Sequence, residues 1–239
     1  MYITMTYNSE IQFTLDTICP WTYLAKRRLD QALAQIRSDD FAGAQGGTNS
    51  SPVHFTVIYK PYQLYPDASR EGEDKYAWYR RTRYGDSAEK MEKYMMLMSS
   101  YGKSEGIDFK FGGTIASTLM AHRMIQFWQE KKGPETADRL VKSLYRQYFE
   151  EERHPSSRET LMAAAKEAGL DVGEAEQFVE DEDEGLQEVK MLIREQAGNG
   201  IDAVPYIVIE GKRRDITLEG AKTVDDYVKA LKTIIKESV

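Results

Sequence analysis

Apolar residues follow strand spacing at both ends of this chain and helical spacing in between, and this pattern limits the fold class. Residues 10–16 alternate apolar and polar side chains and predict a strand, while residues 20–37 predict the helix that follows it. Residues 53–59 are rich in β-branched and aromatic side chains and predict a second strand. A strand, a helix and a strand within about 50 residues indicate a right-handed βαβ unit with parallel strands. Residues 43–52 have the composition of a flexible loop.

The middle of the chain, from residue 74 to residue 197, has helical spacing and contains no convincing strand. Residues 91–101 and 140–148 both repeat apolar side chains at the period of a helix. Strand signals are absent until the chain leaves this region. We therefore predict that these residues form an all-helical unit.

Strand signals return only after Gly200, at residues 203–209 and 216–218, and a final amphipathic helix follows them. Both ends of the chain therefore contribute strands to one α/β unit, with the helical region inserted between them. The predicted units are an α/β domain made of residues 1–73 and 198–239 and an inserted helical subdomain made of residues 74–197.

Cys19 is the only cysteine among 239 residues, and it stands directly before Pro20 at the predicted strand-to-helix turn. Proline is favoured at the first helical position, so Cys19 would be the N-cap, where free N–H groups and the helix dipole favour a thiolate. We therefore predict a pKa for the Cys19 thiol below the free value of about 8.5. The alternative is a small buried apolar residue, because free cysteines are among the most buried residue types.

The stretch Cys19-Pro20-Trp21-Thr22 has the spacing of the redox motif Cys-x-x-Cys, but Thr22 stands where the second thiol would be. A hydroxyl can donate a hydrogen bond to a nearby thiolate, which makes Thr22 a candidate catalytic partner of Cys19. A hydroxyl cannot resolve a mixed disulfide. The chain by itself therefore cannot cycle between a dithiol and a disulfide.

Composition excludes several classes of function. A formal net charge of −7 without a basic stripe argues against nucleic acid as a partner. The first six residues lack a basic segment before an apolar core, and no run of about 18 apolar residues occurs, so we expect no membrane partner and a cytoplasmic location. A single cysteine excludes an internal disulfide framework and a cysteine-rich zinc site. The sequence does not decide the oligomeric state, and a homodimer is one possibility.

The three histidines, His54, His122 and His154, show no metal-ligand spacing, so we expect no metal. His122 lies midway along a predicted apolar helix. It is a candidate general acid or base, although a histidine in such a place is more often a core residue bonded to backbone.

Several separated motifs occur in a fixed order along the chain, and together they resemble one family. They are Cys19-Pro20-Trp21, Lys26-Arg27-Arg28-Leu29, Ala121-His122-Arg123, Val204-Pro205-Tyr206 and Gly220-Ala221. With them the chain resembles the FrnE-type branch of DsbA-like oxidoreductases, which is similar in fold to 2-hydroxychromene-2-carboxylate isomerase and to kappa-class glutathione transferases. The resemblance spans nearly the whole chain and implies a thioredoxin-like α/β fold with a large all-helical insertion.

The chain departs from the FrnE-type pattern at three places. Thr22 replaces the second cysteine, Ser117 stands where asparagine is frequent, and Ala203 stands where glycine is frequent. The fold expectation survives all three departures. The redox assignment does not carry over unchanged, because Thr22 replaces the second cysteine.

The resemblance also implies a cis bond between Val204 and Pro205 that faces the thiol. The backbone of Val204 would then pair with an extended thiol peptide such as glutathione, with glutathione as a cosubstrate. Pro20, Trp21 and Gly220 would complete the substrate or cosubstrate site. The alternative is a purely structural turn.

Three functions follow from these features. The first is a monothiol, glutathione-linked thiol oxidoreductase acting through Cys19. The second is a glutathione-dependent isomerase or transferase on a hydrophobic small molecule of aromatic or polyketide metabolism, enclosed by the tyrosines that cluster over residues 59–84. The third is a catalytically idle thioredoxin-like binding protein. A lowered thiol pKa favours the first two, and an inert thiol favours the third.

Overall fold

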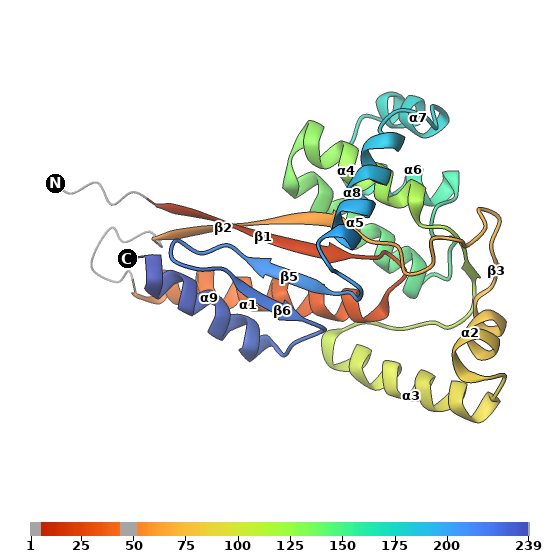
Figure 1. Ribbon diagram of the computed structural model, residues 1–239, viewed down its shortest axis with the longest axis horizontal. Helices are drawn as coiled ribbons and strands as arrows, with labels where there is room; N and C mark the ends of the chain where they lie inside the picture. The colour runs from red at the N-terminus through yellow and green to blue at the C-terminus, as the bar shows by residue number, and fades with distance from the viewer. Residues whose placement is uncertain (1–5, 44–51, 239) are drawn as a thin grey trace.

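A four-stranded sheet made from both ends of the chain is the frame of the molecule (Figure 1). The computed structural model describes residues 6–43 and 52–238, so the loop predicted at residues 43–52 lies almost wholly outside the described part. The strand order is β2-β1-β5-β6, with β1 and β2 parallel and the other pairs antiparallel. The predicted parallel βαβ unit is therefore confirmed. The strands are β1 (Tyr7–Leu15), β2 (Val53–Pro61), β5 (Tyr206–Ile209) and β6 (Ile216–Glu219).

Strand β1 is one of the two interior strands of the sheet and pairs with a neighbour on each edge. Ile11 lies opposite Val57 on one side and Ile209 on the other, and its side chain is fully buried. Apolar side chains on three adjacent strands therefore meet in one layer of the core. Strand β5 begins at Tyr206, later than the predicted residue 203, directly after the proline whose missing N–H cannot join a ladder.

The helices form three groups around this sheet (Figure 1). Helices α1 (Pro20–Gly43) and α9 (Val224–Ser238) pack against each other along the sheet. A second group gathers beside β2, and a two-helix arm stands apart at the end of the molecule. The second group is α4 (Leu119–Lys132), α5 (Pro134–Phe149), α6 (Arg158–Glu167), α7 (Val172–Glu180) and α8 (Leu186–Gly198), and the arm is α2 (Lys75–Tyr84) and α3 (Ala88–Glu105). None of the described helices is both long and apolar enough to cross a bilayer.

The inserted region contains one short ladder that the sequence did not predict. Strand β3 (Glu73–Asp74) pairs antiparallel with β4 (Thr114–Ile115). Two residues are too few to produce a period-two pattern, so propensity could not reveal them. The ladder joins the start of α2 to the segment that follows α3, and it thereby holds both ends of the arm together. The described chain has no strand between residues 120 and 195, as predicted.

A buried charge network joins α1 to β2 and α5. The ammonium group of Lys26 is 1% exposed and lies 2.5 Å from Asp30 Oδ1 and 2.8 Å from Asp138 Oδ1. The hydroxyl of Tyr59 donates to Asp138 Oδ1 at 2.5 Å, and Lys142 Nζ lies 2.7 Å from Asp138 Oδ2. Burial raises the pKa of Asp138, but the charge of Lys26 and hydrogen bonds from Lys142, Lys26 and Tyr59 outweigh it and lower the pKa to about 2.

We predict that Asp138→Asn lowers the free energy of unfolding at pH 7 by about 2 kcal/mol, because the lowered pKa of Asp138 stabilises the folded state above the unfolded value near 3.9. That stability is present above about pH 4 and is lost as the pH falls toward 2. Urea unfolding at pH 3 to 7 should therefore show a smaller loss on acidification in the variant. Glu89→Gln, at an exposed ion pair, is the control and should change little. Equal acid slopes in Asp138→Asn and the natural protein would contradict the network.

Candidate active site

Cys19 lies directly before α1, in the turn that follows strand β1. Its N–H donates to Asp16 O at 3.0 Å, and its own carbonyl accepts from Thr22 N at 3.2 Å and Tyr23 N at 3.3 Å. It therefore starts the helix where the sequence predicted. The side chain is only 3% exposed, and the thiol donates to the carbonyl oxygen of Val204, with 3.7 Å between sulfur and oxygen.

The predicted lowering of the Cys19 pKa is wrong. The pKa of the thiol is raised from about 9 to about 11, mainly by burial and in smaller part by the charge of Asp16. The N–H groups of Thr22 and Trp21 lower the pKa, as expected at a helix start, but desolvation is the largest influence. In this structure Cys19 is therefore a protonated thiol at neutral pH.

Thr22 is buried and its hydroxyl faces backbone. It hydrogen-bonds to the carbonyls of Cys19 at 2.7 Å and Asp16 at 2.9 Å. Its hydroxyl has the weakest of the influences on the Cys19 pKa. The predicted role of Thr22 as a donor to the sulfur is therefore a minor one, and its main structural role is to fix the turn that carries the cysteine.

The segment that closes over Cys19 comes from the other end of the chain. The Val204–Pro205 bond is cis, as the family resemblance implied, and Val204 O is the acceptor of the thiol. Gly220 N donates to Pro205 O at 2.9 Å, with Gly220 at a φ of 75° that favours glycine. The structure thus brings Cys19, Val204, Pro205 and Gly220 into one site.

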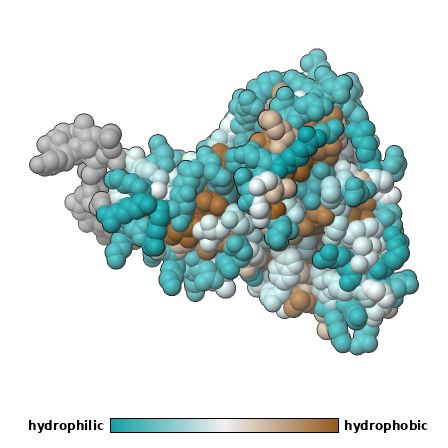
Figure 2. Space-filling view, in the orientation of Figure 1, coloured by the Kyte–Doolittle hydropathy of each residue, from teal (hydrophilic) through white to brown (hydrophobic). Residues whose placement is uncertain are grey.

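The rim of the site is apolar on the side of the arm. Trp21 is 37% exposed and contacts Tyr101 of α3, with 5.6 Å between ring centroids. Met96 and Leu97 of α3 are also exposed, and Figure 2 shows apolar residues scattered among hydrophilic ones on this face of the molecule. The predicted binding residue Trp21 therefore lies where the arm meets the start of α1.

His122 and Asp16 form a buried pair near the thiol. His122 is 1% exposed, and its Nε2 lies 3.3 Å from Asp16 Oδ1, while its Nδ1 has no partner within the described chain. The N–H of Leu64 donates to Asp16 Oδ2 at 2.7 Å. The histidine is thus a core residue, but its partner is a carboxylate instead of backbone. No cluster of three or more His, Cys, Asp or Glu suited to a metal ion occurs among residues 6–43 and 52–238.

Asp16 is the site residue that the sequence interpretation missed. Its carbonyl holds the N–H of Cys19, and its side-chain charge acts on the thiol. An acidic residue at the end of a buried strand, three positions before the cysteine, was the available signal. Asp16 is buried and acts on Cys19, so the buried pair of Asp16 and His122 belongs to the site.

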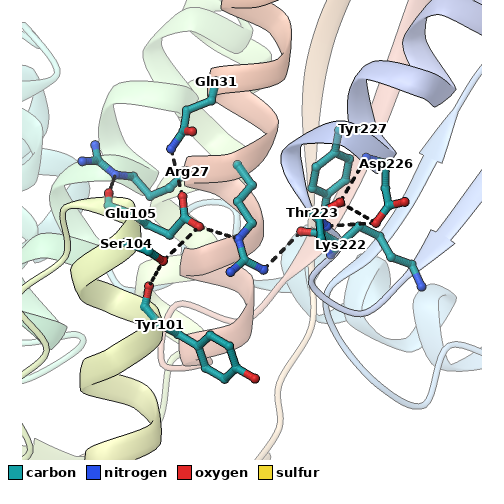
Figure 3. Close-up of polar contacts among 10 residues, drawn as sticks. Arg27, Gln31, Tyr101, Ser104, Glu105, Lys222, Thr223, Asp226 and Tyr227 are labelled. Atoms are coloured by element: carbon teal, nitrogen blue, oxygen red, sulfur yellow. Dashed lines mark hydrogen bonds and ion pairs between the residues drawn. The ribbon is translucent and has the colours of Figure 1, made fainter.

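A group of hydrogen bonds joins the arm to α1, the helix that begins directly after Cys19 (Figure 3). Arg28 Nε and Gln31 Nε2 donate to the two oxygens of Glu105 at 2.7 and 2.9 Å, and Arg27 Nε donates to the Glu105 carbonyl at 3.3 Å. Arg28 Nη1 also donates to Lys222 O at 3.2 Å. The basic motif after Cys19 therefore joins α1, α3 and the loop before α9 around the site.

A narrow crevice opens beside the start of α1. Side chains from α2, α3, α5 and residues 109–111 line it together with Pro20, which follows the cysteine. The space amounts to about 310 Å³ with its open mouth, but only about 20 Å³ is wide enough for the centre of a water molecule. The crevice is thus a tight slot between the arm and the helical group.

The fold agrees with comparisons to known proteins. A family model described as a DSBA-like thioredoxin domain matches residues 10–232. The chain belongs to this family. The FrnE-type branch within it stays a prediction. A search of curated proteins found no match.

Solved DsbA-like structures share the whole fold at low sequence identity. A probable DsbA oxidoreductase from Streptomyces coelicolor is 24% identical with a TM-score of 0.78, covering 96% of this chain and 91% of its own. A 2-hydroxychromene-2-carboxylate isomerase is 16% identical with a TM-score of 0.63, covering 95% and 94%. The cytosolic disulfide reductase DsbM from Pseudomonas aeruginosa is 16% identical with a TM-score of 0.60, covering 95% and 98%. The predicted thioredoxin-like α/β fold is thereby confirmed.

We predict that Cys19 of this DsbA-like protein reacts slowly with iodoacetamide. A pKa of about 11 leaves about two orders of magnitude less thiolate at pH 8 than a free cysteine has. The alkylation rate, followed by intact mass from pH 6 to 11, should keep rising past pH 9. The same protein unfolded in guanidinium chloride is the control, with a midpoint near pH 8.5. A folded midpoint at or below that value would show that burial does not control the thiol.

Proposed function

We propose that this protein is a glutathione-dependent isomerase or transferase for a hydrophobic small molecule, in which Cys19 acts as a protonated thiol. The observation that carries the proposal is the buried Cys19 thiol, which donates to Val204 O and has Thr22 in the place of a resolving thiol. A site with one protonated sulfur is suited to donating a hydrogen bond. It is poorly suited to attacking a disulfide.

Glutathione has a defined way into this site. An extended thiol peptide that pairs with the backbone of Val204 would offer its own N–H to the Val204 carbonyl. The Cys19 S–H, released from that carbonyl, would then donate to the sulfur of glutathione and favour its thiolate form. The solved DsbM structure with GSH supports glutathione as the thiol, since that relative shares the fold.

The chemistry needs no second protein thiol. Glutathione gives its thiol proton to solvent, and its sulfur bonds to an unsaturated carbon conjugated to a carbonyl, while the electron pair of the double bond moves to the carbonyl oxygen. Protonation of that enolate at carbon gives a conjugate, which is transfer. If the carbon–sulfur bond breaks after rotation, the double bond re-forms in the other configuration and glutathione leaves, which is isomerisation. Cys19 keeps its proton and its oxidation state throughout.

Membership of the DsbA-like family favours a second candidate, a monothiol oxidoreductase. In this reading the Cys19 thiolate forms a mixed disulfide, and an external thiol such as glutathione releases it. The raised pKa of Cys19 counts against the required thiolate in the resting protein. The raised pKa of Cys19 is equally compatible with a catalytically idle binding protein. The experiment below distinguishes that possibility from the two enzymes.

We predict that Cys19→Ser and Cys19→Ala behave differently. Glutathione conjugation of trans-4-phenylbut-3-en-2-one, followed by loss of absorbance, should stay within about tenfold of the natural kcat/KM in the serine variant, because its hydroxyl still donates. The alanine variant lacks a donor and should fall about a hundredfold. Reduction of bis(2-hydroxyethyl) disulfide by glutathione should be negligible in all three proteins.

Two other outcomes decide for the competing functions. Disulfide reduction that disappears equally in Cys19→Ser and Cys19→Ala would establish Cys19 as a covalent nucleophile and replace the proposal with the oxidoreductase. Absence of both activities in the natural protein, with glutathione binding absent by calorimetry, would overturn both enzymatic candidates and favour the binding protein.

A further inference from the structure

Lys75 is a buried cation in the wall of the crevice. The residue is 5% exposed, and its Nζ lies 3.3 Å from Lys110 O, 3.4 Å from Tyr148 O and 4.4 Å from the centre of the Tyr148 ring. Within the described chain no carboxylate oxygen lies within the 4.0 Å of an ion pair. The other buried lysine, Lys26, has two such partners. Lys75 is therefore a desolvated charge without a counterion.

The backbone holds Lys75 in this position. Its N–H donates to Gly113 O at 2.9 Å. Gly113 has a φ of 85°, and a Cβ there would lie 2.3 Å from the carbonyl oxygen of Glu152, so only glycine permits this approach. Burial lowers the pKa of Lys75 to about 8, against the charges of Glu152 and Asp74, which raise it. Burying an ammonium group in this way costs free energy unless an anion lies beside it.

Phenol groups of Tyr79, Tyr94 and Tyr148 line the same crevice. The Tyr148 hydroxyl is buried and has no partner within the described residues. Burial raises the pKa of Tyr79 and Tyr94, so both phenols stay protonated at neutral pH. Tyr79 and Tyr94 stack with 5.9 Å between centroids. The crevice thus combines aromatic walls, an unpaired cation and an unused donor.

We propose that this crevice is the subsite for the second substrate, that this substrate is an aromatic molecule with a carboxylate or enolate oxygen, and that Lys75 recognises the oxygen. The proposal rests on the proposed function for the reaction and adds the class of substrate. An anion on Nζ would supply the missing counterion, and the Tyr148 hydroxyl is placed to donate as a second group. Because the slot is tight, a ring enters only when the side chains of the arm move apart.

The competing explanation is that Lys75 only braces the carbonyls of Lys110 and Tyr148. A brace predicts no discrimination between a charged and a neutral ligand. Cinnamate and cinnamamide test this, because they share a flat aryl body and differ in one group, a charged carboxylate against a neutral amide. Binding is measured by calorimetry without glutathione, so the reaction of the site is not involved.

At pH 7 the natural protein should bind cinnamate about tenfold more tightly than cinnamamide, as expected for a charge-assisted hydrogen bond. Lys75→Met should reduce that ratio to about one, and Lys75→Arg should retain most of it. Lys93→Met is the matched control, because Lys93 is exposed on α3 and its loss should leave the ratio unchanged. Thermal unfolding of each variant shows whether it has folded.

The pH profile of the natural protein gives a second readout that needs no variant. The charged or titratable groups around Lys75 are Asp74, Lys110, Glu152 and the phenols of Tyr79, Tyr94 and Tyr148. Burial lowers the pKa of the Lys75 ammonium to about 8, so the preference for cinnamate should fall between pH 7 and pH 10 as this group loses its charge.

Equal affinities for the two ligands in the natural protein, absence of cinnamate binding, or a preference that survives in folded Lys75→Met would overturn the subsite. If Lys75→Met does not fold, a preference that stays flat from pH 7 to pH 10 overturns it. A cinnamate preference without glutathione conjugation would instead leave the subsite standing and remove the proposed reaction. The two failures are therefore distinguishable.

Discussion

The burial of one sulfur against one carbonyl is the constraint on which the site depends. Cys19 begins α1, where exposed N–H groups normally favour a thiolate, yet its thiol faces Val204 O in a region with almost no solvent. Desolvation exceeds the effect of the helix start, so the proton stays on the sulfur. With Thr22 in place of a second thiol, the same turn that would activate a nucleophile presents a hydrogen-bond donor.

The polar motifs around the cysteine serve mainly to hold this arrangement. Arg28 and Glu105 fix the arm to α1, and Lys26 with Asp138 fixes α1 to α5. Arg123, 1% exposed, donates to carbonyls of α7 and of the segment between α7 and α8. Each of these buried charges has its partners within the chain. Lys75, like Arg123, meets backbone carbonyls and no carboxylate of the described chain within ion-pair distance, but Lys75 lies in the wall of a crevice, and this difference identifies the crevice as a place for an external anion.

Local sequence was sufficient for the elements and for the place of the cysteine. The period-two run before Cys19 and the proline after it predict a strand, a turn and a helix without knowledge of tertiary contacts. The partnership of Cys19 with Val204 followed only from the family resemblance, because no local pattern links residues so far apart. The thiol pKa was predicted with the wrong sign, because burial depends on side chains from distant segments. Lys75 was missed because lysines are almost always exposed.

The most direct test of the account is to ask which sulfur carries the thiolate in the complex with glutathione. Ultraviolet thiolate absorbance can be titrated with pH for the free protein, for the glutathione complex and for the complex of Cys19→Ser. We predict that the free protein shows no thiolate until the pH approaches about 11, and that the complex shows one with a pKa below that of free glutathione. This thiolate should persist in the Cys19→Ser complex, because it resides on glutathione. Its loss in that variant would place the thiolate on Cys19 and contradict the account.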